Sequence, residues 1–153
     1  MGRSSVNGGG ASLPATGGSD ADASMIEAQK RRFGAYFPRA FACALALTGD
    51  ESAAKDIVSE AFGRVFTQST EMTEEEFIVE IFAITRDLSR SIAGPNSTLS
   101  TREEEVLAFV FDARLGRDEI RRLMDTTEQG LSATLLRALR KLQAGISPAA
   151  LTA

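Results

Sequence analysis

Large apolar side chains recur along most of the chain at the three- and four-residue spacing of an amphipathic helix. The first such stripe places Phe33, Phe37, Phe41 and Leu45 four residues apart. We expect Pro38 either to bend this helix or to mark its first turn, because proline cannot continue the hydrogen-bond ladder of a helix. No segment alternates apolar and polar residues over a useful length, as a half-buried strand does. The pattern therefore predicts an all-α fold.

Short polar motifs predict where the next helices begin. Asp50 is a typical N-cap for the second helix. Thr73 with Glu76, and Ser100 with Glu103, have the spacing of capping boxes at the starts of the third and fourth helices. The core positions expected in these three helices are Ile57, Val58, Ala61, Phe62, Val65, Phe66, Phe77, Ile81, Ile84, Leu88, Val106, Leu107, Val110 and Phe111.

The segment after Gly116 predicts two short helices with a tight turn between them. The first helix is expected over residues 117–124 and the second over 128–142, with the turn at 125–127. This is the layout of a helix-turn-helix, whose second helix can enter the major groove of DNA. The residues expected to pack the last helix onto the others are Leu131, Leu135, Ala138 and Leu142.

Composition divides the chain into five parts. Residues 1–23 are rich in Gly, Ser, Ala and Asp, which predicts a disordered N-terminal tail. Residues 24–93 and 99–144 are expected to form two small helical domains, and residues 145–153 a C-terminal tail. The linker at 94–98 reaches roughly 20 Å at most, so we expect the two domains to pack against each other.

Composition also narrows the class of function. The 153 residues include no histidine and one cysteine, Cys43, which we expect in the core. This excludes histidine-based catalysis, a Cys/His zinc site and an intramolecular disulfide, and it fits a cytoplasmic protein. With no phosphate-binding glycine loop and no activated nucleophile, we expect neither an enzyme nor a small-molecule substrate, cofactor or metal. No apolar run is long enough for a membrane helix, and the net charge of −4 argues against a general binder of polyanions.

Two blocks of the chain carry a distinctive combination of turns and helices. The first runs from Leu47 to Phe62, where a Gly-Asp turn precedes an acidic helix. The second begins at Leu99 and ends with the helix-turn-helix and its terminal Arg-Ala-Leu-Arg-Lys-Leu segment. In this order the blocks resemble regions 2 and 4 of the sigma-70 family, specifically the small extracytoplasmic-function type, over nearly all of residues 30–143. The resemblance implies two small helical bundles that bind core RNA polymerase and promoter DNA.

The resemblance also implies roles for individual residues. The acidic helix of region 2 binds the polymerase clamp in this family, and the matching residues here are Asp56, Ser59, Glu60 and Arg64. The residues implied in DNA contact are Arg86 and Arg90 in the third helix and Thr127, Gln129, Ser132, Ala133, Thr134, Arg137 and Lys141 in the helix-turn-helix.

Several departures from the family pattern leave other interpretations open. Glu80 and Asp87 stand where the family has tryptophan and asparagine, and Ser132 and Thr134 replace two cations. These changes favour a sigma-like mimic that binds an anti-sigma factor or another regulator without initiating transcription. A third interpretation is a helix-turn-helix regulator whose N-terminal helices dimerise. A further alternative is that the acidic face of the second helix is only solvated surface. The cations of the last helix can likewise be solvated residues that the helix dipole favours at a C-terminus.

Overall fold

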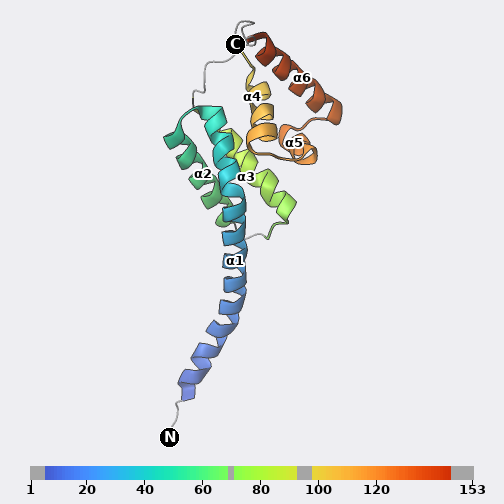
Figure 1. Cartoon of the computed structure of the whole chain (residues 1–153). Helices are drawn as coiled ribbons and strands as arrows, with labels where there is room; N and C mark the ends of the chain where they lie inside the picture. Colours follow the sequence, from blue (N-terminus) through green and yellow to red (C-terminus); the bar gives the residue numbers. More distant parts are fainter. Residues whose placement is uncertain (1–5, 69–70, 93–97, 146–153) are drawn as a thin grey trace. The chain divides into compact units, whose positions relative to one another are not determined.

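The computed structural model describes residues 6–68, 71–92 and 98–145, and these contain helices and no strand (Figure 1). The predicted all-α fold is therefore confirmed for the described residues. Its elements are α1 (Val6–Thr48), α2 (Glu51–Phe66), α3 (Glu74–Ser89), α4 (Thr101–Leu107), the π-helical turn η2 (Ala108–Asp112), α5 (Arg117–Met124) and α6 (Glu128–Gly145). No described helix combines the length and the apolar character needed to cross a membrane.

The chain divides into two compact units after Tyr36. Within the first unit, α1 begins at Val6, within the tail for which the sequence predicts disorder, and residues 1–5 of that tail lie outside the described residues. α1 extends through this segment although its glycines and Pro14 are poor helix formers. Most of the linker at 94–98 and of the C-terminal tail at 145–153 lies outside the described residues.

The second unit, residues 37–153, contains most of the first region and all of the second region that we expected to be separate domains. Helix α3 packs against α5, and α4 against α6. Arg39 in α1 adds a tie to the segment before α5, because its guanidinium donates to the main-chain oxygens of Ala113 (2.7 Å) and Arg114 (2.9 Å). The expectation that a short linker brings the two regions together agrees with these contacts.

Local capping determines where the helices of this unit start. The Asp50 carboxylate accepts a hydrogen bond from the backbone N–H of Ala53 (3.1 Å), after α1 ends at Gly49 with a φ of 70°. The two predicted capping boxes, Thr73 with Glu76 and Ser100 with Glu103, are both present. The predicted N-termini of α2, α3 and α4 are therefore confirmed.

An aromatic cluster fills the space between α1, α2 and α3. Phe62 lies within 6.1 Å, between ring centroids, of Phe37, Phe66 and Phe77. On α1 the fully buried residues are small ones, among them Cys43, rather than the larger stripe proposed from the sequence. Small side chains allow the neighbouring helices to approach this part of α1 closely, and Phe37 contacts the rings of Phe41 and Phe62.

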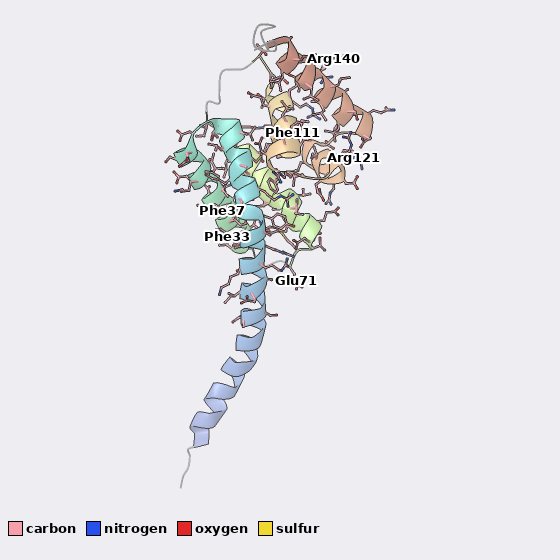
Figure 2. The ribbon with its side chains drawn as sticks, in the orientation of Figure 1. Phe33, Phe37, Glu71, Phe111, Arg121 and Arg140 are labelled. Atoms are coloured by element: carbon pink, nitrogen blue, oxygen red, sulfur yellow. The ribbon has the colours of Figure 1, made fainter. Side chains whose placement is uncertain are left out.

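The π-helical turn η2 changes which residues of the fourth helix face the core. One extra residue per turn shifts the helical register by about 100°, so the apolar pattern is displaced after Ala108. Phe109 is fully buried and packs edge-on against Phe82, with ring centroids 6.5 Å apart. Phe111, which we predicted in the core, is 57% exposed and is labelled in Figure 2. The prediction for Phe111 was therefore wrong.

Candidate functional site

The first candidate surface is the outward face of α2. Asp56, Ser59, Glu60 and Arg64 are all exposed, while the opposite face of the helix is buried against its neighbours. Glu60 and Arg64 form the i,i+4 ion pair that their spacing favours. The four residues implied in polymerase binding thus share one accessible helix face.

The second candidate surface is the pair α5 and α6, which are joined by the three residues Asp125, Thr126 and Thr127. Asp125 takes the left-handed conformation, with a φ of 50°, and so ends α5 sharply. The Thr127 hydroxyl accepts a hydrogen bond from the backbone N–H of Gly130 (3.0 Å) and caps the start of α6. A Cβ atom on Gly130 would clash with the Thr126 hydroxyl, so a larger residue here would force that side chain to move. The predicted helix–turn–helix element order is confirmed.

Most of the residues implied in DNA contact are exposed on α6 or in the turn before it. Thr134 is the exception, because it is 5% exposed and its hydroxyl donates to the Gly130 carbonyl (2.9 Å). Thr134 lies three residues after the buried Leu131 and four before the buried Ala138, so all three share the inner face of the helix. Thr134 is therefore excluded from the surface, contrary to prediction. The exposed residues are Thr127, Gln129, Ser132, Ala133, Arg137 and Lys141.

Polar contacts within the protein occupy the N-terminal part of this surface. Arg117 in α5 donates to the Ser132 hydroxyl (2.7 Å) and to the Glu128 carboxylate (2.6 Å), both in α6. Glu128 also lies 3.7 Å from the guanidinium of Arg121. These interactions fix α6 against α5 and lower the pKa of Glu128, chiefly through the hydrogen bond from Arg117.

A buried carboxylate pairs with two of the three cations of α6. Glu103 in α4 is only 3% exposed, and its carboxylate accepts hydrogen bonds from Lys141 (2.8 Å) and from the backbone N–H of Ser100 (2.8 Å). Arg137 lies 3.5 Å from the other carboxylate oxygen. The Lys141 ammonium and then the Ser100 N–H lower the pKa of Glu103 to about 2, so this group is ionised at neutral pH. Arg137 and Lys141 are therefore paired within the protein.

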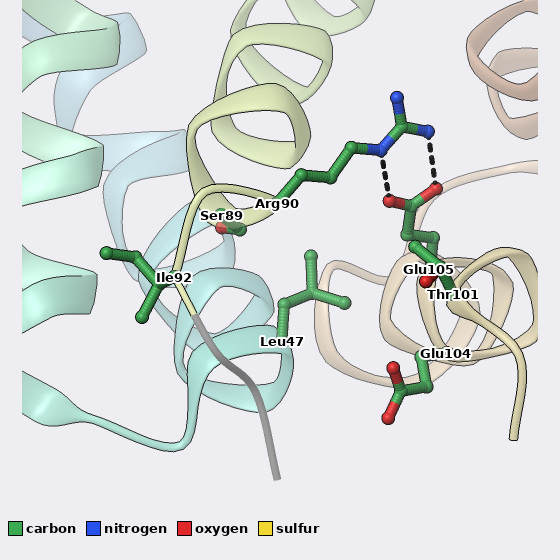
Figure 3. A pocket seen from close by; sticks show the side chains of 7 residues that line it. All are labelled: Leu47, Ser89, Arg90, Ile92, Thr101, Glu104 and Glu105. Atoms are coloured by element: carbon green, nitrogen blue, oxygen red, sulfur yellow. Dashed lines mark hydrogen bonds and ion pairs between the residues drawn. The ribbon is translucent and has the colours of Figure 1, made fainter. Parts of the chain in front are cut away.

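The two cations of α3 are also paired. Arg86 donates to the main-chain oxygen of Leu123 in α5 and to the carboxylate of Asp87 (2.9 Å). Arg90 forms a bidentate pair with the buried Glu105 of α4, with N–O distances of 2.7 and 2.9 Å (Figure 3). Both arginines connect the first half of this unit to the second, whereas the sequence implied that they contact DNA.

A shallow pocket lies beside the Arg90–Glu105 pair, with a volume of about 290 Å³. Figure 3 shows its lining, which comes from the ends of α1 and α3, the residues following α3, and the start of α4. The apolar residues are Leu47 and Ile92, whereas Glu104, whose pKa is raised by desolvation, lies on the α4 side. Among the described residues no group of acidic or cysteine side chains is arranged to hold a metal ion.

Sequence reasoning missed the role of the glutamates in α4. The capping motif identifies Glu103 only as a capping residue, and no motif in the sequence assigns a role to Glu105. The sequence feature that points to their burial is spacing, because both lie within one turn of the apolar Val106. The exposure of the apolar Leu136 and Leu139 on α6 was also missed, and Leu142, which we expected to pack this helix onto the others, is exposed as well.

Comparison with known proteins yields no relative: no protein-family model, no curated protein and no solved structure matches this chain.

Proposed function

We propose that the protein acts in transcription initiation as a sigma-70-like factor, binding core RNA polymerase through the outward face of α2. The observation that carries the proposal is the shared exposure of Asp56, Ser59, Glu60 and Arg64 on this face. The resemblance in the sequence assigns the polymerase contact to these residues. The order of elements that follows, with α5 and α6 joined by a three-residue turn, supports a region 4-like segment for promoter DNA.

Affinity purification of the full chain from its native cell tests the polymerase contact. We expect the subunits of core RNA polymerase to co-purify, and Asp56→Arg to abolish their recovery by placing a cation on the acidic face. Glu51→Arg is the matched control, because it makes the same charge change at an exposed position at the start of α2. Recovery of polymerase by Asp56→Arg at the level of the unmodified protein would refute the assignment.

A second candidate function is favoured by the pairing of the cations. It is a sigma-like protein that binds an anti-sigma factor or another regulator through protein contacts and does not start transcription. Arg137 and Lys141 pair with Glu103, and Arg86 and Arg90 are engaged in contacts that join α3 to α5 and α4. A protein that binds DNA needs cations that are available for phosphate groups.

Footprinting on promoter fragments at moderate salt separates the two candidates. A sequence-specific footprint that Arg137→Ala erases supports the promoter-binding factor and rejects the mimic. The absence of a footprint, together with recovery of a sigma-regulating protein in the same purification, supports the mimic.

A further inference from the structure

The outward face of α6 is apolar at its centre. Leu136 is 48% exposed and Leu139 is 39% exposed, although each lies on a helix with a well-buried opposite face. Ser132, Leu136, Leu139 and Gln143 follow one another at intervals of four, three and four residues. This is the spacing of the contact seam between two helices that pack side by side. The surface thus has the pattern of a helix-docking face.

Positive charge borders this seam. Residues 129–145 include no acidic residue, and of their three cations Arg137 and Lys141 pair with Glu103, which leaves Arg140 to face a partner. Arg140 is exposed, lies next to Leu139 in the chain, and forms no hydrogen bond or ion pair with the described residues; Figure 2 labels its position on α6. A complementary surface would therefore present apolar side chains flanked by carboxylates.

Duplex DNA is a poorer match to this face. Arg137 and Lys141 are held by Glu103, which leaves Arg140 as the cation of α6 without a partner among the described residues. Each neutralised phosphate contributes about 0.9 to the salt dependence of binding, so one available cation supplies little affinity. Two exposed leucines at the centre of the face offer nothing to phosphate groups.

A second copy of the chain is also a poor match. A symmetric dimer would place the same patch against itself, so the unpaired Arg140 of each copy would meet a patch that carries the same cation and no acidic residue. Like charges across an interface oppose association.

We propose that the outward face of α6 docks an amphipathic helix of a partner protein, whose apolar seam covers Leu136 and Leu139 and whose flanking carboxylates pair with Arg140. The proposal rests on the second candidate function and specifies the partner's chemistry. The docking face lies on α6 and the proposed polymerase contact on α2. Either proposal can therefore fail while the other holds.

A designed peptide tests the proposal on the full-length protein. The probe is a helical peptide of about three heptads with a leucine seam flanked by glutamates, and its matched counterpart carries lysines in place of the glutamates. We expect the acidic peptide to bind and the basic peptide not to bind. The double variant Leu136→Ser/Leu139→Ser should lose at least tenfold in affinity, whereas Phe111→Ser, at an exposed apolar site outside α6, should bind normally.

Charge reversal gives the sharper test. Arg140→Glu should weaken binding of the acidic peptide and permit binding of the basic one, a gain that loss of folding cannot produce. Equal binding of both peptides, or unchanged binding by the double leucine variant, would overturn the proposal. So would a DNA footprint, or a dimer in sedimentation equilibrium, that the double leucine variant abolishes. Recovery of core polymerase, which depends on α2, is scored separately.

Discussion

Arg90 at the end of α3 and Glu105 in α4 form a two-fold hydrogen-bonded ion pair, although Glu105 is almost fully buried and the Arg90 side chain is half exposed. The pair connects two segments that the sequence assigns to different domains, across a stretch of chain outside the described residues. Without Arg90, the Glu105 carboxylate would be a buried charge with no cation and no access to water. Without Glu105, the half-exposed Arg90 would still be solvated.

We therefore expect Arg90→Ala to destabilise the protein by roughly 2–4 kcal/mol, since it leaves a buried carboxylate without its cation. Arg64→Ala is the matched control, because its partner Glu60 is exposed, and we expect a loss below about 1 kcal/mol. Urea denaturation followed by circular dichroism measures both values. Similar losses for the two variants would show that the Arg90–Glu105 pair has no special role in joining the two halves.

The pH dependence of the free energy of unfolding should show the contribution of the ionised Glu103 carboxylate. Its pKa in the folded protein is lowered from an ordinary value of 4.5 to about 2 by Lys141 and Ser100. The stabilisation is therefore fully present above about pH 5 and is lost as the pH falls from there through 2. Thermal unfolding of the unmodified protein and of Glu103→Gln over this range measures the effect. The variant should lose part of the acid dependence, while Glu51→Gln, at an exposed position on α2, should retain it.

The shift caused by η2 predicts opposite results for two phenylalanines of the same helix. Phe109→Ala removes a fully buried ring and should cost about 3–5 kcal/mol. Phe111→Ala removes an exposed ring and should change the free energy of unfolding by no more than about 0.5 kcal/mol. Denaturant titration of both variants measures the difference. A larger loss for Phe111 would mean that the helix continues with a regular α-helical register.

The first part of α1 should exchange its amide protons much faster than the last part. Residues 6–23 contain several glycines and Pro14, and in a helix interior these cost about 1 and about 3 kcal/mol each relative to alanine. Hydrogen exchange read by NMR should show amides in this stretch exchanging orders of magnitude faster than the amide of the buried Cys43. Equal protection throughout α1 would require a stabilising contact for its first half.

The features predicted well from the sequence are those that a few neighbouring residues decide. The caps at Asp50, Thr73 and Ser100 each depend on a side chain and a backbone group three residues apart, so the motif contains the whole interaction. The same holds for the Glu60–Arg64 pair, which is one turn apart on α2. Local spacing therefore predicted the helix starts and one face of α2.

The features predicted poorly depend on partners that are distant in the sequence. Glu103 reaches Lys141, and Glu105 reaches Arg90, only after the helices have packed. Thr134 looks polar and surface-exposed in the sequence, but bonding to the preceding turn satisfies its hydroxyl and lets it be buried. The position of a π-helical turn also has no simple local signature, so the apolar pattern of the fourth helix was assigned to the wrong face at Phe111.

The extra residue in η2 affects the orientation of α5 and α6. Deleting one residue between Ala108 and Asp112 would convert this turn to ordinary α-helix and rotate everything that follows about the axis of α4. Leu115 and Ile120, both buried, would then no longer meet the surface they now cover. We therefore expect the extra residue in this π-helical turn to determine the orientation of the outward face of α6.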